Sequence, residues 1–335
     1  MTADIHASVT RIAELEDRSY ETEPLPQEEW GTGDYVLTRV THRPDPDVRV
    51  ENPLGRKVEP MEGETIVGAL GTRRATRGFV GDWRDAREDG LLDVLTGGGV
   101  LGRVTSASPF SPTPIEVEYE GHVVLDGEVA RMADHGLDAG TDEFETPVVL
   151  VTGTSMSAGK TMSARVITRV LVEQGRRVVA CKLTGAGRYS DALSMDVAGA
   201  EAVYDFVDGG LPTTVVPEAT FEAAIGSVLG RIEDHQVDVV VAEVGASPLE
   251  PYNGETAVEL VEEQVAFTVL CASDPYAVVG IEEAFGRSPD LVSGIATNTT
   301  AGIDLIDRLT DCSALNLQTE RAKEPLGEML AAALS

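Results

Sequence analysis

The clearest signal for chemistry is a run of nine residues near the middle of the chain, Gly153-Thr154-Ser155-Met156-Ser157-Ala158-Gly159-Lys160-Thr161. A phosphate-binding loop has the pattern G-x-x-x-x-G-K-[ST], in which backbone amides surround the phosphates, the lysine reaches the β- and γ-phosphates and the hydroxyl holds Mg²⁺. Lys160 and Thr161 occupy the last two positions, but Gly153 stands one place earlier than the first glycine of the pattern. All nine residues are therefore candidates for binding a nucleotide.

The neighbouring sequence has the order that a phosphate-binding loop requires, which is strand, loop and helix. Pro147–Thr152 is a continuous apolar run, typical of a parallel strand buried on both faces. Thr161–Gln174 has apolar residues at helical spacing. A helix start without a ligand is the alternative, but the chain has only four lysines and one of them stands here. The context favours a nucleotide site.

A carboxylate closes another predicted strand, Val237–Val244, at Glu243. An acidic residue at the end of a buried strand beside a phosphate loop is suited to binding Mg²⁺ together with Thr161. The alternative is a side chain in solvent. Because a lone buried carboxylate is costly, we expect a metal ion or a lysine to accompany Glu243.

A lysine, Lys182, stands near the end of the predicted strand Arg177–Leu183, where parallel sheets bind their ligands. A cation there suits an anionic substrate, and a solvated strand end is the alternative.

The loop that follows, TGAGRYSD, supplies further candidates for substrate binding and catalysis. Thr184 and Gly185 are candidate substrate contacts, and Arg188 could clamp a carboxylate in bidentate fashion. Asp191, like Asp196 beyond the loop, could serve as a general base or a metal ligand. A merely polar loop explains the same residues equally well.

The loop G-T-x-x-x-x-G-K-T resembles that of dethiobiotin synthetase and its relatives, P-loop enzymes that phosphorylate a carboxylate or carbamate. The chain is also similar to a P-loop family that includes proposed D-glutamate N-acetyltransferases. That second resemblance includes the Thr184–Gly187 turn, the Asp205–Gly209 segment DFVDG and the acidic strand end at Glu243. The likeness covers roughly Val148 to Thr300, and the N-terminal part of the chain has no counterpart in it.

The synthetase resemblance implies ATP and Mg²⁺ as cofactors, Glu243 on the metal ion and Lys182 on phosphate and substrate. The usual proline after that lysine is replaced by Leu183 here. The resemblance also implies that Asn298 reads adenine and that the chain forms a homodimer. Asp274, which follows another predicted strand, could also face the nucleotide. A guanine-reading N-K-x-D motif is not visible, which favours ATP over GTP.

Three functions compete on this evidence. The first is an ATP- and Mg²⁺-dependent ligase or kinase that activates a small carboxylate substrate, with Lys160, Lys182, Glu243 and Asp191 as catalytic residues. The second is an acyl-CoA-dependent N-acetyltransferase-like enzyme whose loop holds a pyrophosphate. The third is a nucleotide-switched regulator or metallochaperone. Thr154 and Ser155 stand where partition ATPases usually carry an extra lysine, and the Cys or His clusters and guanine motif of metal-insertion GTPases do not appear, which disfavours this function.

Two domains are expected in this α/β chain. Residues 1–140 contain short strand-like runs separated by turn residues and predict a mostly β domain, a small barrel or a sandwich. One helix is expected there, at Asp82–Leu95. Residues 141–335 alternate strands and helices and predict a P-loop domain with a mostly parallel sheet and flanking helices. A polar linker is expected at Asp134–Thr146.

Composition limits the possible partners. The formal net charge of -31 disfavours nucleic acid and anionic membranes as partners. Few lysines among many acidic residues suggest adaptation to high salt. Three widely spaced cysteines predict buried thiols rather than disulfides, and the histidines lack metal-ligand spacing. The N-terminal sequence has no signal-peptide pattern, and a cytoplasmic protein is expected.

Two segments of the N-terminal part, one rich in arginine and one in glycine, are candidate anion sites. Arg73, Arg74 and Arg77 form the densest basic cluster of the chain, for which a surface patch paired with carboxylates is favoured. Gly97-Gly98-Gly99 could form an anion-binding nest or a tight turn.

Overall fold

A computed structural model of the chain describes residues 3–87, 89–140 and 143–335, so residues 141 and 142 of the expected linker lie outside the described residues. The chain divides into two compact units. The barrel unit comprises Met1–Asp138, Ala186–Ser190 and Phe206–Pro217, and the P-loop unit comprises Ala139–Gly185, Asp191–Asp205 and Glu218–Ser335. Each unit is described by itself.

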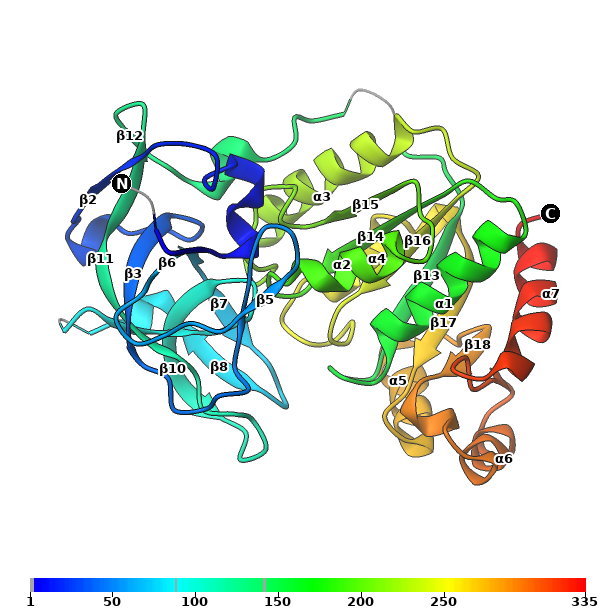
Figure 1. Cartoon of the computed structure of the whole chain (residues 1–335). Coiled ribbons are helices and arrows are strands. Elements are labelled where there is room, and N and C mark those ends of the chain that lie inside the picture. Colours follow the sequence, from blue (N-terminus) through cyan, green and yellow to red (C-terminus); the bar gives the residue numbers. More distant parts are fainter. Residues whose placement is uncertain (1–2, 88, 141–142) are drawn as a thin grey trace. The chain divides into compact units, whose positions relative to one another are not determined.

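The barrel unit is built on one ten-stranded sheet that closes on itself (Figure 1). Pairing of β6 with β10 completes a ring in the order β6-β3-β11-β9-β10. The strands of the sheet are β1 (Ile5–His6), β2 (Glu21–Glu23), β3 (Tyr35–His42), β6 (Thr65–Leu70), β7 (Thr72–Arg74), β8 (Phe79–Asp82), β9 (Leu91–Val94), β10 (Val100–Ala107), β11 (Glu116–Leu125) and β12 (Glu128–Val129). A separate hairpin joins β4 (Val50–Glu51) and β5 (Lys57–Val58).

Inward-facing apolar residues of these strands fill the barrel, among them Val36, Ile66, Leu92 and Leu101, all fully buried. Four short 3-10 helices connect the strands: η1 (Ser8–Ala13), η2 (Gln27–Glu29), η3 (Trp83–Asp85) and η4 (Met132–His135). The mostly β character expected for this part of the chain is confirmed.

The helix expected at Asp82–Leu95 is wrong. Asp82 ends β8, and its carboxylate accepts a hydrogen bond from the Arg84 amide, which starts only the single turn η3. Gly90 then takes a left-handed φ of 71°, which stops any helix. Leu91–Val94 pairs with both β10 and β11. This pairing with other strands makes the segment a strand instead of a helix.

Two segments that follow strands of the P-loop unit belong to the barrel unit by their packing, residues 186–190 and 206–217. The carbonyl of Gly187 accepts a hydrogen bond from the Thr96 hydroxyl at 2.9 Å. A Cβ on Gly98 would lie 2.2 Å from the same carbonyl oxygen, so the Gly97–Gly99 turn is packed against protein backbone. The carboxylate of Glu51 accepts the amides of Tyr189 and Ser190 at 2.6 and 3.1 Å.

The P-loop unit contains a seven-stranded sheet in the order β15-β14-β16-β13-β17-β18-β19, with every pair parallel. The α/β class with a parallel sheet is therefore confirmed. Its strands are β13 (Val148–Gly153), β14 (Val178–Thr184), β15 (Ala202–Asp205), β16 (Val239–Val244), β17 (Val265–Cys271), β18 (Leu291–Ser293) and β19 (Ser313–Ala314). Strand β18 is short, because Gly294 turns the chain with a φ of 86° into a 3-10 helix.

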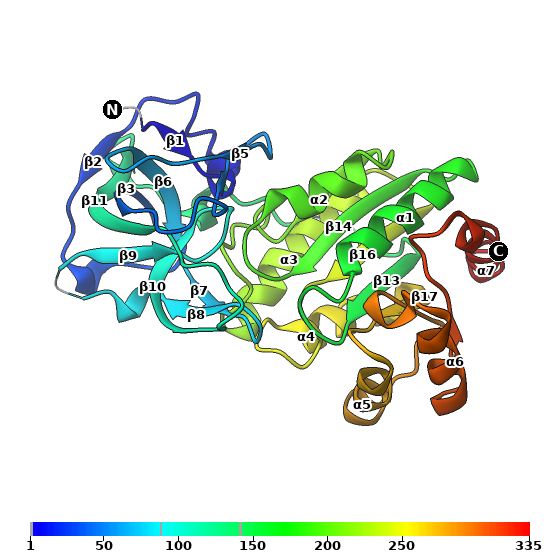
Figure 2. The same cartoon turned by 60° about the horizontal axis from the view of Figure 1, so that its bottom comes forward.

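Helices cover both faces of this sheet (Figure 2). Helices α1 and α7 bury one face, through residues such as Ile167 and Leu330, and α3 and α4 lie on the other. The helices are α1 (Lys160–Glu173), α2 (Tyr189–Asp196), α3 (Glu218–Glu233), α4 (Gly254–Glu259), α5 (Pro275–Phe285), α6 (Thr300–Leu309) and α7 (Lys323–Ala333), with 3-10 turns η5 (Glu262–Gln264), η6 (Ile295–Thr297) and η7 (Glu320–Ala322).

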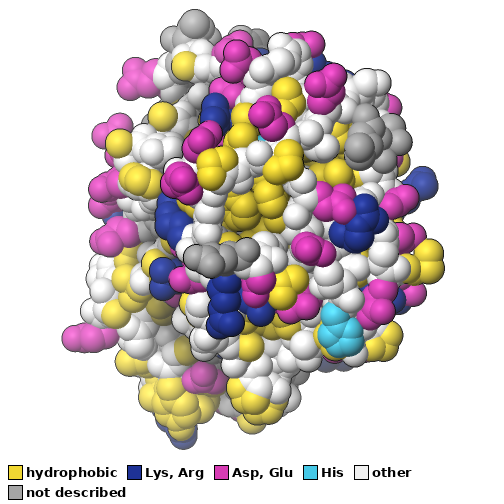
Figure 3. All heavy atoms as spheres, turned by 90° about the vertical axis from the view of Figure 1, so that its left-hand side faces the viewer, with side chains coloured by type: hydrophobic (Ala, Val, Ile, Leu, Met, Phe, Trp, Pro, Cys, Tyr) yellow, Lys and Arg dark blue, Asp and Glu magenta, His cyan; other side chains and the backbone are white. Residues whose placement is uncertain are grey.

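All three cysteines are buried and free, as expected. Figure 3 shows one face of the molecule, on which acidic side chains lie scattered among Lys and Arg. Within the described ranges, no helix is both long and apolar enough to cross a bilayer.

Candidate functional site

The displaced glycine of the loop is explained by the lysine that the loop surrounds. Gly153 is the last residue of β13, and a Cβ there would lie 2.8 to 2.9 Å from Cδ, Cγ and Nζ of Lys160. The Lys160 ammonium donates to the carbonyl oxygen of Ser155 at 2.8 Å, so the loop folds back over its own lysine. A glycine at position 153 thus makes room for the Lys160 side chain.

Thr154 occupies the position where the standard pattern has glycine, and it fastens the loop to the end of β17. Its amide donates to the carbonyl of Cys271 at 3.0 Å. Its hydroxyl accepts from the amide of Ser273 at 3.0 Å. The side chain that departs from the pattern therefore anchors the loop.

The second glycine allows the loop to pass a neighbouring segment closely. Gly159 has a left-handed φ of 111°, and a Cβ on it would lie 3.1 Å from Cα of Gly294. The amide of Ile295 donates to the carbonyl of Ala158 at 3.1 Å. Asn298 is exposed and follows η6 directly, so the segment that carries it is attached to the loop.

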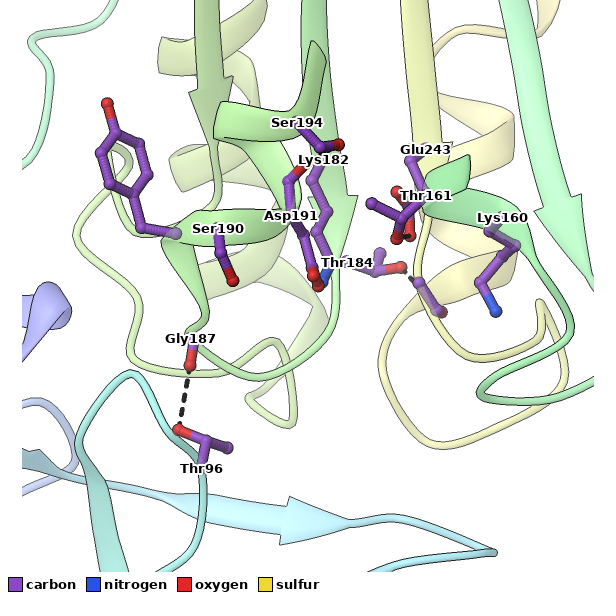
Figure 4. A network of polar contacts seen from close by, with 12 residues as sticks. Thr96, Lys160, Thr161, Lys182, Thr184, Gly187, Ser190, Asp191, Ser194 and Glu243 are labelled. Atoms are coloured by element: carbon purple, nitrogen blue, oxygen red, sulfur yellow. Dashed lines mark hydrogen bonds and ion pairs between the residues drawn. The ribbon is translucent and has the colours of Figure 1, made fainter. Parts of the chain in front are cut away.

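The hydroxyl of Thr161, in the first turn of α1, donates to Oε1 of Glu243 at 3.2 Å (Figure 4). Glu243 is only 2% exposed and lies on β16, and its other oxygen, Oε2, has no hydrogen-bond partner among the described residues. Burial raises the pKa of Glu243, and Lys182 and Lys160 oppose that rise. A buried carboxylate oxygen without a partner is costly unless a cation or donor joins it.

The residues present therefore fit a divalent cation. Mg²⁺ is usually bound by one or two protein oxygens together with phosphate oxygens and water. Thr161 Oγ1 and Glu243 Oε2 are oxygen donors of this kind. Across the parts of the chain that the structure describes, no group of three or more His, Cys, Asp or Glu residues is placed to hold a metal ion.

Lys182 lies directly opposite Glu243 in the sheet, because these two residues are register partners on β14 and β16. Its ammonium is buried and forms an ion pair with Asp191 of α2 (Figure 4). Burial alone would lower the pKa of Lys182, but the carboxylates of Asp191 and Glu243 raise it above its ordinary value. Lys182 is therefore held as a cation.

Lys160 is in a different electrostatic position. Its side chain is 6% exposed, and burial lowers the pKa of its ammonium, with the Glu243 carboxylate opposing that change. Its ammonium donates a hydrogen bond to the neutral carbonyl of Ser155. An anion bound at the loop would compensate its charge.

Several predicted site residues lie elsewhere or already have other contacts. Thr184 is fully buried, and its hydroxyl donates to the Gly245 carbonyl at 3.1 Å, while Gly185 adopts a φ of 140°. Arg188 is exposed and belongs to the barrel unit. Asp196 is exposed at the end of α2. Asp274 caps α5 by accepting the amides of Tyr276 and Ala277.

Two buried groups near this cluster were not assigned a role from the sequence. Asp205 ends β15, is 1% exposed and is the register partner of Lys182 on the side away from Glu243. A Cβ on Gly245 would lie 2.1 Å from the Thr184 carbonyl, so β14 and the end of β16 pass too closely for a side chain. Asp205 could have been found from the sequence, because it is the first residue of the segment DFVDG that the second resemblance includes.

Comparison with models of protein families gives no match, and neither does comparison with curated proteins. The chain is similar to the hydrogenase maturation factor HypB of Archaeoglobus fulgidus, with 14% identity and a TM-score of 0.39 over 58% of this chain and 92% of that one. Chloroplast FtsY of Physcomitrella patens shows 13% identity and a TM-score of 0.36, over 59% and 67% of the two chains.

A DUF1611 family protein of Anabaena variabilis shows 15% identity and a TM-score of 0.37, over 59% of this chain and 61% of that one. These TM-scores are too low to support a conclusion about function, so we infer the function from the chain's own residues.

Proposed function

We propose that the P-loop unit binds ATP with Mg²⁺ and transfers the γ-phosphoryl group to the carboxylate of a small substrate. The observation that carries this proposal is the arrangement of Lys160, Thr161 and Glu243 around one loop. A loop lysine, a helix-start hydroxyl and a buried carboxylate with an unpartnered oxygen are the three parts that phosphoryl transfer needs from such a loop.

Thr161 and Glu243 would hold the metal ion, and the amides at the start of α1 would face the phosphates. Bound Mg²⁺ neutralises charge that develops on the transferred phosphoryl group. Glu243 would then gain, at Oε2, the partner that this buried oxygen lacks among the described residues. The unpartnered oxygen is therefore a reason to expect a metal ion here that does not depend on any resemblance.

Lys160 would exchange its hydrogen bond with the Ser155 carbonyl for the β- and γ-phosphates. Burial favours its neutral form in the chain alone, and the phosphate charge would favour the ammonium. Because the neutral carbonyl is a weaker partner than a phosphate oxygen, this exchange contributes to nucleotide binding.

Lys182 supplies a second fixed cation for the acceptor carboxylate. Its present partner is itself a carboxylate, that of Asp191. The ammonium therefore already binds a group of the same kind as the substrate carboxylate.

In the reaction, an oxygen of the substrate carboxylate forms a bond to the γ-phosphorus. The bond from that phosphorus to the β–γ bridging oxygen breaks, and ADP leaves with the electron pair. The product is an acyl phosphate, and no proton is transferred in this step.

The test is to trap that acyl phosphate. Purified protein is incubated in high salt with ATP, Mg²⁺ and hydroxylamine, and pools of small carboxylic acids are added in turn. Hydroxamate and ADP should form in equal amounts with one pool and not with the Lys160→Ala variant. Lys323→Ala, which changes a half-buried lysine at the start of α7, should behave as the wild type.

ADP formation without hydroxamate in every pool would contradict transfer to a carboxylate and leave a nucleotide hydrolase or switch. Transfer of an acetyl group from acetyl-CoA, with no dependence on ATP, would instead identify an acyltransferase.

A further inference from the structure

A cavity lies in the P-loop unit, on a face of the sheet rather than at the loop. It has a volume of about 310 Å³ and lies against β13 and β17, between α4 and α5. Side chains alternate along a strand, and Val149 and Val151 of β13 pack in the core under α1 and α7. Leu150 and Thr152 therefore face the opposite side, where they line the cavity.

Two threonines give the floor of the cavity a polar character. Thr152 of β13 and Thr268 of β17 lie on it beside Leu150 and Leu270. Thr152 is 5% exposed. Within the described ranges, no side-chain hydrogen bond engages the hydroxyl of Thr152 or that of Thr268, although the Thr268 amide donates to the carboxylate of Asp290. Both threonines line the cavity, so a ligand there can exchange hydrogen bonds with their hydroxyls.

The walls of the cavity are apolar, and its rim is neutral. Val258, Ile281, Phe285 and Pro289 form the walls. Arg287 stands at the rim, but its guanidinium pairs with Glu262 at 2.9 Å. Arg287 is the charged residue of the lining, and it already has a carboxylate partner, so the lining suits an uncharged ligand.

We propose that this cavity binds an uncharged small molecule with a ring-shaped apolar body and one hydrogen-bonding group. The volume is about twice the ~150 Å³ of an engineered apolar cavity that holds benzene, which leaves room for a fused two-ring body. The apolar walls supply most of the binding free energy, and the Thr152 and Thr268 hydroxyls orient the polar group.

The position of this site connects it with the phosphate loop. Thr152 immediately precedes Gly153, and β17 ends at Cys271, whose carbonyl accepts the Thr154 amide. A molecule on the floor of the cavity therefore contacts the two strands that hold the start of the loop. Its binding should change the environment of the Gly153 and Thr154 amides.

The test uses indole as the probe, with indene as a hydrocarbon of the same shape that lacks the N–H donor. Binding to the full chain is measured by calorimetry, and ¹H–¹⁵N spectra follow the Gly153 and Thr154 amides. Saturable indole binding is expected, with movement of both amides. Indene should bind about 3- to 10-fold more weakly, the range that one hydrogen bond contributes.

Three variants locate the binding. Ile281→Trp should fill the cavity and abolish binding, whereas Val279→Trp, on the exposed side of the same helix α5, should leave it unchanged. The double variant Thr152→Val/Thr268→Val keeps the shape, removes both hydroxyls and should weaken indole to the level of indene; it also serves if Ile281→Trp fails to fold. No saturable binding, binding that survives in Ile281→Trp, or undiminished affinity for indole in the double variant would overturn the proposal.

Discussion

Thr161 and Glu243 are joined by a hydrogen bond of 3.2 Å between Oγ1 and Oε1, which connects the start of α1 to the end of β16. The two residues are 82 positions apart in the sequence. Their contact brings the phosphate loop and an acidic strand end into one site, and it leaves Oε2 of Glu243 buried without a partner in the described chain. This relationship is the structural basis of the proposed metal site.

Replacing Glu243 with glutamine should remove the dependence of nucleotide binding on Mg²⁺. The amide keeps the shape but lacks the charge that holds a divalent cation, and loss of a ligand or its partner typically weakens metal binding on the order of 10- to 100-fold. Calorimetric titration of ATP with and without Mg²⁺ measures the effect. Glu259→Gln, which changes an exposed carboxylate on α4, should retain the full Mg²⁺ effect. An unchanged response in Glu243→Gln would place the metal elsewhere.

Replacing Asp191 with asparagine should destabilise the P-loop unit. The change leaves the buried Lys182 ammonium without its ion-pair partner, and breaking a buried pair on one side costs about 2 to 3 kcal/mol when another carboxylate remains nearby. The pKa of Lys182 should then drop, because burial favours its neutral form. Urea denaturation measures the free energy of unfolding. Asp196→Asn, an exposed change on the same helix, is the matched control, and equal stability of the two variants would show that the pair contributes nothing.

Replacing Gly153 with alanine should weaken nucleotide binding much more than it weakens the fold. The new Cβ would meet the flexible Lys160 side chain at 2.8 to 2.9 Å, so the lysine moves aside and leaves its place in the loop. A displacement of this kind costs on the order of 10- to 100-fold. Gly226→Ala is the control, since a Cβ in the helix α3 meets nothing within 4 Å there. That variant should gain about 0.5 to 1 kcal/mol of stability and bind nucleotide normally.

His6 of the barrel unit should give the stability a dependence on pH. Burial lowers the pKa of His6 below its ordinary value of 6.5, with Glu16 opposing that shift, and its Nε2 lies 3.0 Å from the Tyr20 hydroxyl. The folded chain therefore holds this ring neutral, and protonation favours unfolding. The contribution is complete above pH 6.5 and is lost as the pH falls below that value.

The measurement is the free energy of unfolding of the wild type and of His6→Gln between pH 5 and 8, about the range in which histidine titrates. The difference between the two proteins should change as the pH drops in that range, with the wild type losing more stability. A constant difference across the range would mean that His6 has the same pKa in the folded and unfolded chains.

The sequence predicts the structure correctly in those segments whose conformation is determined by their own residues. The Gly159-Lys160-Thr161 start of α1, the buried strand before it and the alternation of strands and helices after residue 147 all predict the α/β fold that the structure has. The expectation that a buried Glu243 needs a companion follows from desolvation alone, and the structure places Lys182 opposite it in register.

Features that depend on contacts between segments far apart in the sequence could not be predicted. Leu91–Val94 becomes a strand because β10 and β11 lie beside it, and its own pattern does not reveal that. The role of Thr154 as an anchor depends on Ser273 and Cys271, more than 100 residues away. The packing of residues 186–190 and 206–217 with the barrel unit has no local signal either.

Calorimetric titration of the full chain with ATP in high salt and Mg²⁺, repeated on Lys160→Ala, decides whether this loop binds a nucleotide. We expect one site per chain, stronger with Mg²⁺ than without it, and loss of that binding in the variant, while Lys323→Ala binds as the wild type does. Absence of ATP binding to the wild-type chain, or equal binding by Lys160→Ala, would contradict the claim that this loop is a nucleotide site.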